Sequence, residues 1–199
     1  GFANAGQVCI SSQRVIATPS IHDDLLDALK AKVGQLTAGD QLAEGTNVGP
    51  LVREADARRV EEWLGQARDQ GAELLCGGDR EGSVVQPAVL ANVNRDMRMS
   101  CDELFGPAVG VTRADSIDEA IRLANDTEYG LAAYVYSRDI MRAMRVGRGI
   151  ETGMVGINRG LMSDPAAPFG GAKQSGLGRE GGVTGILEFM EPKYFAVEF

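Results

Sequence analysis

The stretch QRVIATPSIHDDLLDALKAKVGQL, residues 13–36, shows how this chain is built. It begins with a short β-branched run that Pro19 ends, which predicts a strand. Ser20 can then cap a helix with Asp23 three residues later, a variant of the capping box. Over residues 21–36, apolar side chains recur every three or four positions, which indicates a helix with one buried face. A strand followed by an amphipathic helix is the repeating unit of α/β folds.

The same alternation continues along the chain. We expect helices over about 54–70, 116–125 and 139–149, and a capping box at Ser116–Glu119 opens the second of these. We expect strands over 72–76, 84–93, 107–112, 131–136 and 154–158, with Pro87 making the second piece an edge strand or an irregular one. The pattern predicts an α/β fold with a mainly parallel sheet flanked by helices. Ligands of such sheets bind beyond the carboxyl ends of the strands.

Composition narrows the class of protein. The chain has 199 residues, enough for one domain with a full core, and its 20 basic and 28 acidic side chains disfavour a nucleic-acid surface. Three cysteines and one histidine are too few and too scattered for a metal site or a disulfide framework. The sequence shows neither a long apolar run nor an export leader, so we expect a cytoplasmic protein without a membrane partner.

Cys9 is the candidate nucleophile. It ends the segment Asn4-Ala5-Gly6-Gln7-Val8-Cys9, whose small residues would let a carbonyl group reach both the sulfur and main-chain N–H groups. A thiolate that attacks an aldehyde creates an alkoxide, which such donors stabilise. A lone cysteine is otherwise most often a small buried hydrophobe. Cys76 and Cys101 lack these surroundings and are predicted to be structural.

Two other features suggest different chemistry and are set aside. GLGREG, residues 176–181, matches the dinucleotide-binding pattern GxGxxG, but no buried strand precedes it and the acidic partner 20 residues later is missing. We interpret it as a glycine turn that allows close backbone approach. His22 could serve as the base of a cysteine hydrolase, yet its place at the start of an amphipathic helix favours a solvated or capping role.

Three segments in order resemble the aldehyde dehydrogenase family: FANAGQVC at 2–9, ELFGP at 103–107 and PFGGAKQSG at 168–176. The resemblance implies NAD or NADP as cofactor and a small aldehyde as substrate, with Cys9 forming a thiohemiacetal and then a thioester. It implies that Glu103 hydrogen-bonds the nicotinamide ribose and that Phe105 packs beside it. The residues that it implies around the substrate are Val8, Ile10, Ser163 and Phe169.

The segments 160–167 and 173–181 most resemble the succinate-semialdehyde dehydrogenases. In that subgroup, the residue matching Ser163 helps hold the substrate carboxylate. Ala3 stands where the subgroup often has an arginine, and Arg159 is a weak local substitute. Another small or hydroxylated aldehyde therefore stays open as the substrate.

The resemblance also implies how the chain is divided. Residues 1–164 would be the catalytic domain, 165–190 a glycine-rich segment returning towards a cofactor domain, and 191–199 a strand that makes a homo-oligomer. The family's nucleotide-binding domain, glutamate base and oxyanion asparagine precede the cysteine, and eight residues cannot hold them. We therefore expect the C-terminal portion of a longer enzyme, inactive alone. The alternative is a non-catalytic α/β binding module, in which Cys9 is no more reactive than the other two thiols.

Overall fold

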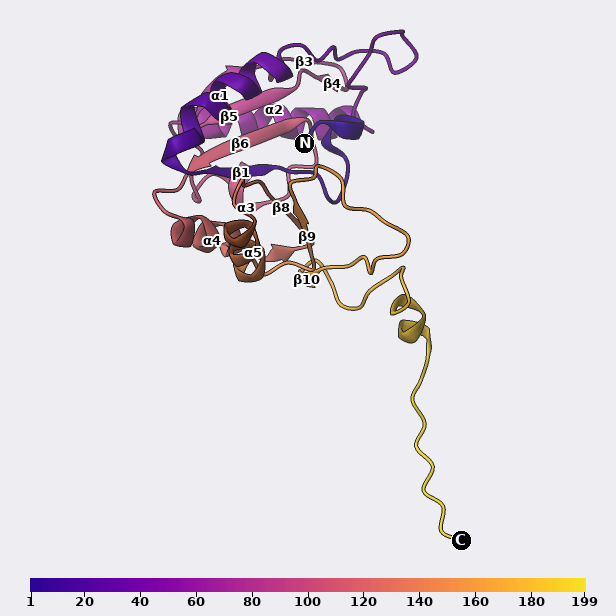
Figure 1. Cartoon of the computed structure of the whole chain (residues 1–199). Coiled ribbons are helices and arrows are strands. Elements are labelled where there is room, and N and C mark those ends of the chain that lie inside the picture. The colour runs from indigo at the N-terminus through magenta and orange to yellow at the C-terminus, as the bar shows by residue number, and fades with distance from the viewer. The chain divides into compact units, whose positions relative to one another are not determined.

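The computed structural model describes all 199 residues, which form two compact units, Gly1–Asp126 and Thr127–Phe199. Strands and helices alternate in both units, as the sequence predicts (Figure 1). None of the helices combines the length and the apolar composition that crossing a membrane would require.

A four-stranded sheet in the order β1-β6-β5-β2 forms the centre of the first unit. Strands β1 (Arg14–Ala17), β6 (Ala108–Arg113) and β5 (Ala88–Ala91) run parallel, and β2 (Glu73–Cys76) pairs antiparallel with β5. The mainly parallel α/β sheet is thus confirmed. All four residues of β5 are buried, which is typical of a parallel strand covered on both faces.

Two helices supply the cover, α1 (Pro19–Val33) and α2 (Glu54–Asp69) (Figure 1). Successive side chains of a strand point to opposite faces, so Leu90 joins the core cluster that contains the buried residues of α2, and its neighbour Val89 joins the cluster on the α1 side. The buried α2 residues are Ala57, Val60, Trp63, Leu64 and Ala67.

Shorter elements complete the first unit. They are the 3-10 helix η1 (Ala3–Gly6), the hairpin strands β3 (Arg80–Glu81) and β4 (Val84–Val85), and the helices α3 (Arg98–Cys101) and α4 (Ile117–Asn125). The expected capping box opens α4: Ser116 Oγ accepts a hydrogen bond from the Glu119 N–H at 3.1 Å. The Glu119 carboxylate reaches back to the Asp115 N–H at 2.8 Å, one residue before the expected partner.

The structure corrects two of the expected details. Helix α1 begins at Pro19 and its N-cap, Thr18, makes no side-chain capping bond, so Ser20 is not the cap. Proline suits the first helical turn because its fixed φ is already helical and its missing N–H needs no partner there. Of the two alternatives for residues 84–93, the irregular piece is confirmed, because Pro87 lies in the break between β4 and β5. The edge alternative is wrong, because β5 is an interior strand.

The second unit contains a parallel pair, β8 (Ala132–Val135) and β9 (Met154–Ile157), connected through α5 (Ile140–Gly149). Asp139 caps α5, since its Oδ1 accepts hydrogen bonds from Met141 N at 2.9 Å and Arg142 N at 3.1 Å. A second, antiparallel pair joins β7 (Tyr129–Gly130) to β10 (Ala172–Lys173), and the 3-10 helix η2 (Gly185–Phe189) follows.

The glycine-rich segment between β10 and η2 is a set of tight turns. Gly176, Gly178 and Gly181 have positive φ, and the Arg179 guanidinium donates to Gly171 O at 2.7 Å and Gly178 O at 2.6 Å. No buried strand leads into it and no α-helix leaves it, so the GxGxxG match is a turn and not a nucleotide site.

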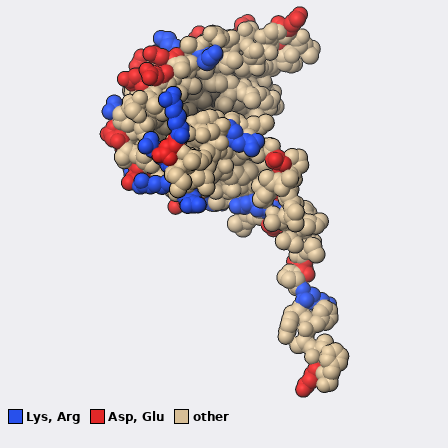
Figure 2. All heavy atoms as spheres, in the orientation of Figure 1, with Lys and Arg blue, Asp and Glu red and all other residues tan.

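Residues 191–199 carry no strand in this structure and extend as coil from η2 (Figure 1). The oligomerisation strand therefore stays a prediction. Charged side chains of both signs are interspersed on the face drawn in Figure 2. The acidic excess belongs to Gly1–Asp126, with 20 acidic and 12 basic side chains, whereas Thr127–Phe199 carries eight of each.

Candidate active site

The loop that carries Cys9 starts with an unusual backbone turn. Asn4, Ala5 and Gly6 are three consecutive left-handed residues, with φ of 50°, 57° and 73°. A left-handed non-glycine residue costs roughly 1–2 kcal/mol, so the turn needs support. Gln7 provides it: its N–H and its side-chain Nε2 each donate to Asn4 O at 3.1 Å, and its carbonyl accepts from Asn4 Nδ2 at 3.2 Å.

Cys9 itself lies on the next turn, with its thiol exposed. The Ser11 N–H donates to Val8 O at 2.9 Å, and the Ser11 hydroxyl donates to Gly1 O at 3.2 Å. Val8 and Ile10 flank the sulfur and are half-buried. The sulfur is therefore open to a substrate on a turn that is fixed at both ends.

The other two thiols have different environments. Cys76 is half-buried at the end of β2, and burial raises the pKa of its thiol. Cys101 is exposed but donates its hydrogen to the Arg95 carbonyl oxygen at 2.6 Å. Cys9 is exposed and lines a small hollow.

Glu103 and Phe105 project from the segment that leads from α3 into β6. Between them, Leu104 is fully buried and anchors the segment, and its carbonyl accepts a hydrogen bond from Arg59 at 2.5 Å. Both flanking side chains are exposed, and Phe105 is left-handed with a φ of 50°. The Gln13 side chain also binds this segment, through Met99 O, Asp102 O and Leu104 N.

The two loops meet through their main chains. A Cβ added to Gly6 would lie 2.0 Å from Gly106 O, and a Cβ added to Gly106 would lie 2.4 Å from Val60 Cγ2 on α2. Neither position accommodates a side chain as packed. Ala5 and Gly6 are both buried, so these small residues serve the packing beneath the loop, and Gly6 also lines the hollow beside Cys9.

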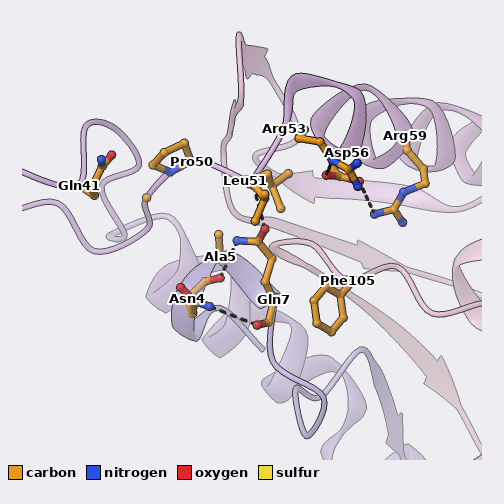
Figure 3. A pocket seen from close by; sticks show the side chains of 12 residues that line it. Asn4, Ala5, Gln7, Gln41, Pro50, Leu51, Arg53, Asp56, Arg59 and Phe105 are labelled. Atoms are coloured by element: carbon orange, nitrogen blue, oxygen red, sulfur yellow. Dashed lines mark hydrogen bonds and ion pairs between the residues drawn. The ribbon is translucent and has the colours of Figure 1, made fainter.

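One small hollow is lined by four of the predicted residues, Val8, Cys9, Glu103 and Phe105. Its other lining residues are Gly6, Ser11, Gln13 and Gly106. The structure thus brings together predicted residues that lie some 95 positions apart in the sequence. Ile10 is beside Cys9 in the chain but does not line the hollow. Phe105 also borders a larger cavity of about 690 Å³ (Figure 3), so this residue lines both spaces.

The larger cavity has a mixed lining (Figure 3). Asp56 and Arg59 come from the first turns of α2, and Asp56 pairs with Arg53 at 3.2 Å. The Gln7 Oε1 accepts a hydrogen bond from Val52 N at 3.0 Å, and both residues line the cavity. An aromatic ring, a guanidinium, a carboxylate and amides suit a polar heterocycle with a sugar, and the volume lies in the range of small-molecule sites.

Sequence reasoning missed Gln7, Gln13, Asp56 and Arg59. The one available signal was the spacing of Asp56 and Arg59, which places both on one side of the start of a helix. The roles of the two glutamines depend on contacts with segments at least 45 positions away, which no local pattern reveals.

Two of the predicted substrate residues, Ser163 and Phe169, lie in the second unit. Ser163 is exposed, and Phe169 is half-buried where its main chain pairs with Glu180. The Asn158 side chain accepts from Ser137 N and donates to Ser137 O, both at 2.9 Å, so it ties the ends of β8 and β9 together.

His22 is not a solvated residue. It is buried on α1, its Nδ1 lies 2.7 Å from Asp23 Oδ1, and it lines neither hollow. The cysteine hydrolase interpretation therefore has no histidine base in the lining of either hollow. No group of three His, Cys, Asp or Glu side chains could hold a metal ion in this structure.

Comparison with known proteins gives a consistent result. The model of the aldehyde dehydrogenase family matches residues 1–195. The chain is 42% identical, over 199 residues, to the succinate-semialdehyde dehydrogenase (NADP(+)) of Escherichia coli strain K12, covering 98% of this chain and 41% of that protein. It is 43% identical, over 196 residues, to the 3-sulfolactaldehyde dehydrogenase of Pseudomonas putida, covering 97% of this chain and 40% of that protein.

Solved structures of the family also superpose on this chain. An aldehyde dehydrogenase from Brucella melitensis biovar abortus 2308 superposes with a TM-score of 0.93 at 41% identity, covering 98% of this chain and 40% of that one. The betaine aldehyde dehydrogenase of Staphylococcus aureus, solved with NAD+, gives a TM-score of 0.88 at 37% identity, covering 94% and 38%. The chain thus spans about two fifths of the length of these relatives.

Proposed function

The chain belongs to the aldehyde dehydrogenase family, and on that premise we propose that it supplies the nucleophile and one wall of the cofactor site of an NAD(P)-dependent aldehyde dehydrogenase. The observation that carries the proposal is that Cys9, Glu103 and Phe105 line the same hollow. These are the residues to which the family resemblance assigns the attack on the aldehyde and the contact with the nicotinamide ribose.

Cys9 performs the covalent step. Its thiolate attacks the carbonyl carbon, a carbon–sulfur bond forms, and the carbonyl oxygen becomes the alkoxide of a thiohemiacetal. When bound, the nicotinamide cofactor accepts the hydride that leaves this carbon. The resulting thioester reacts with water, the carbon–sulfur bond breaks, the carboxylic acid is released and the Cys9 thiol is regenerated. The turn at 8–11 leaves the Cys9 thiol exposed, which gives an aldehyde access to the sulfur.

The residues that line the two spaces fit the cofactor. Glu103, in the small hollow, is an exposed carboxylate that can accept hydrogen bonds from ribose hydroxyls, and the Phe105 ring offers a face for the sugar and the heterocycle. Arg59 and Asp56 add a donor and an acceptor on the helix side of the cavity. Because Phe105 borders both spaces, a cofactor resting on it would end close to Cys9.

We propose succinate semialdehyde as the substrate to test first. Two of the relatives are named for anionic aldehydes, succinate semialdehyde and 3-sulfolactaldehyde. The unit that carries Cys9 has an acidic excess, so its net charge does not attract an anion, and specific hydrogen-bond donors would have to select the substrate carboxylate. A carboxylate-selective enzyme has a higher kcat/KM for succinate semialdehyde than for butyraldehyde. Equal values would refute carboxylate selection and favour another small or hydroxylated aldehyde.

Differential alkylation tests the nucleophile. Iodoacetamide labelling read by mass spectrometry should modify Cys9 first, Cys101 more slowly because its thiol is hydrogen-bonded, and Cys76 last because it is half-buried. Equal labelling of all three thiols would favour the non-catalytic binding module.

Activity measurements complete the test. In the active enzyme that carries this chain, Cys9→Ser should lower kcat by at least about a thousandfold, whereas Cys101→Ser should leave it within about twofold. The isolated 199-residue chain should form no NAD(P)H from an aldehyde at 340 nm, because residues 1–199 contain no nucleotide-binding βαβ motif. Aldehyde-dependent absorbance from the isolated chain would contradict this part of the proposal.

The partner that we propose is a second copy of this chain. Tyr194, Phe195 and Val197 are each at least two-thirds exposed, and a tail with such a composition can pair with a strand of a second copy. Deleting residues 191–199 should convert the oligomer to a smaller species in size-exclusion chromatography. An unchanged elution volume would exclude the tail as the contact.

A further inference from the structure

Gln13 occupies a junction between the two loops of the proposed site. It lies four residues after Cys9 and immediately before β1, and its main-chain carbonyl accepts a hydrogen bond from Gly110 N of β6 at 2.9 Å. Its side chain leaves the sheet and crosses to the segment 99–104. One residue thus connects the strand that follows the nucleophile with the segment that presents Glu103 and Phe105.

Both ends of the Gln13 amide are used. Nε2 donates to Met99 O at 2.5 Å and to Asp102 O at 2.8 Å, and Oε1 accepts from Leu104 N at 2.6 Å. The three main-chain groups lie on either side of Glu103. Only a side chain with two donors and an acceptor at one tip satisfies all three, and among side chains of this length glutamine is the one that does so without a charge.

The other contacts of the segment do not replace this link. Arg59 also reaches Leu104, but through the carbonyl oxygen rather than the N–H. Arg98 pairs with the Asp102 carboxylate at 2.9 Å, a contact within the segment itself, and its guanidinium lies 4.5 Å from the Trp63 ring centroid on α2. These contacts hold the segment to α2, and the Gln13 side chain ties it to the start of β1, beside the Cys9 loop.

We propose that Gln13 is a positioning residue that sets the placement of Glu103 and Phe105 relative to Cys9. The inference rests on the proposed function, because the cofactor contacts of Glu103 and Phe105 are part of that proposal. Gln13 lines the small hollow beside Cys9 and acts through the segment it holds. Its loss loosens the placement of the cofactor-contacting side chains while the Cys9 turn, which has its own hydrogen bonds, stays in place.

Two variants separate the roles of the donors and the acceptor. Gln13→Met has a similar length and neither donor nor acceptor. Gln13→Glu retains an acceptor for Leu104 N–H but turns a carboxylate towards the carbonyls of Met99 and Asp102. Gln35→Glu is the matched control, since Gln35 is exposed beyond the end of α1 and no side-chain hydrogen bond holds it.

In the isolated chain, hydrogen exchange of the Leu104 amide should be about tenfold faster in Gln13→Met, the factor expected for one lost hydrogen bond. It should be unchanged in Gln13→Glu and Gln35→Glu. In the active enzyme that carries this chain, both Gln13 variants should raise the KM for the NAD+ or NADP+ that supports turnover by about tenfold. Their kcat and the rate of Cys9 alkylation should stay within about twofold of the parent.

A purely structural role would lower the fraction of folded enzyme and hence kcat, and would leave KM unchanged. That result, or an unchanged Leu104 exchange rate in Gln13→Met, overturns the inference. Failure of the proposed function is recognised separately, because a Cys9→Ser enzyme would then retain its turnover. The exchange measurement does not require turnover, so it tests the Gln13 link even in that case.

Discussion

Replacing Gly106 with alanine tests the stack of main chains on which the candidate site rests. Gly106 does not have a left-handed φ, so alanine meets no backbone penalty there. Its Cβ would lie 2.4 Å from Val60 Cγ2, at least 1 Å closer than ordinary van der Waals contact. Val60 is fully buried on α2 and cannot turn its methyl towards solvent. Overpacking of this kind costs about 1–3 kcal/mol of unfolding free energy.

A second substitution, Val60→Ala, should relieve the clash that Gly106→Ala creates. Val60→Ala removes both methyl groups and leaves Val60 Cβ, 3.5 Å from the added carbon, which is an ordinary contact. Alone, Val60→Ala should cost about 2 kcal/mol through the space it leaves. In the double variant the new methyl group occupies part of that space. We therefore expect the double variant to be more stable than the sum of the two single changes by about 1–2 kcal/mol.

Trp63 is the single tryptophan of the chain and lies one helical turn after Val60, so its fluorescence during urea unfolding reports on this region. Gly65→Ala is the control: a Cβ at this α2 position meets no atom within 4 Å, and the change should stabilise the helix by about 0.5–1 kcal/mol. A neutral Gly106→Ala, or single and double effects that simply add, would refute the reasoning.

Three further predictions concern stability and reactivity. Ser116→Ala should lower the unfolding free energy by about 1 kcal/mol in urea titrations, because it removes the observed cap of α4. Ser20→Ala removes no cap and should change the unfolding free energy by less than about 0.5 kcal/mol. Equal losses in the two variants would contradict the assignment of the caps. The hydrogen bond and charge of Arg58, followed by those of Arg80, hold the pKa of Glu54 below its usual range. The contribution of these contacts to folding stability is therefore fully present above the ordinary glutamate pKa and is lost as the pH falls through the lowered pKa. Glu54→Gln should therefore shift the melting temperature downward at pH 7 and converge with the parent in acid, while Glu44→Gln, at an exposed loop position, should shift it at neither pH. Burial raises the pKa of the Cys76 thiol. In the folded protein, the alkylation rate of Cys76 should therefore reach half of its plateau at a higher pH than in the urea-unfolded protein. Coincident pH profiles for the two states would show that the thiol is open to solvent.

Periodicity predicted the fold because the relevant information is local. The apolar spacing of residues 21–33 and the β-branched run at 14–17 gave α1 and β1, and the Ser116 capping box placed the start of α4 to within one residue. Other details depend on tertiary context. Pro87 alone does not decide between an edge strand and an irregular piece; the chain breaks there, so an interior strand can begin at the next residue.

The candidate site was predictable only in part. The loop of Cys9 and the Glu103–Phe105 pair were found by their resemblance to a family, and the structure places them around one hollow. The reason for the glycines was not predictable. Gly6 is small because Gly106 O lies against it, and a contact between positions a hundred residues apart leaves no pattern in either segment. The same holds for the Gln13 amide.

The contact between Gly6 and Gly106 also bears on how such a site could diversify. It joins main-chain atoms, so exchanging the side chains at positions 3, 8 or 10 leaves it unchanged. Selection for a different ligand can therefore act on side chains of the Cys9 loop without disturbing the contact that supports the loop. Library mutagenesis confined to these three positions should yield mostly folded variants, whereas randomising positions 6 and 106 should not. The rigidity of the backbone contact is what makes the neighbouring side chains replaceable.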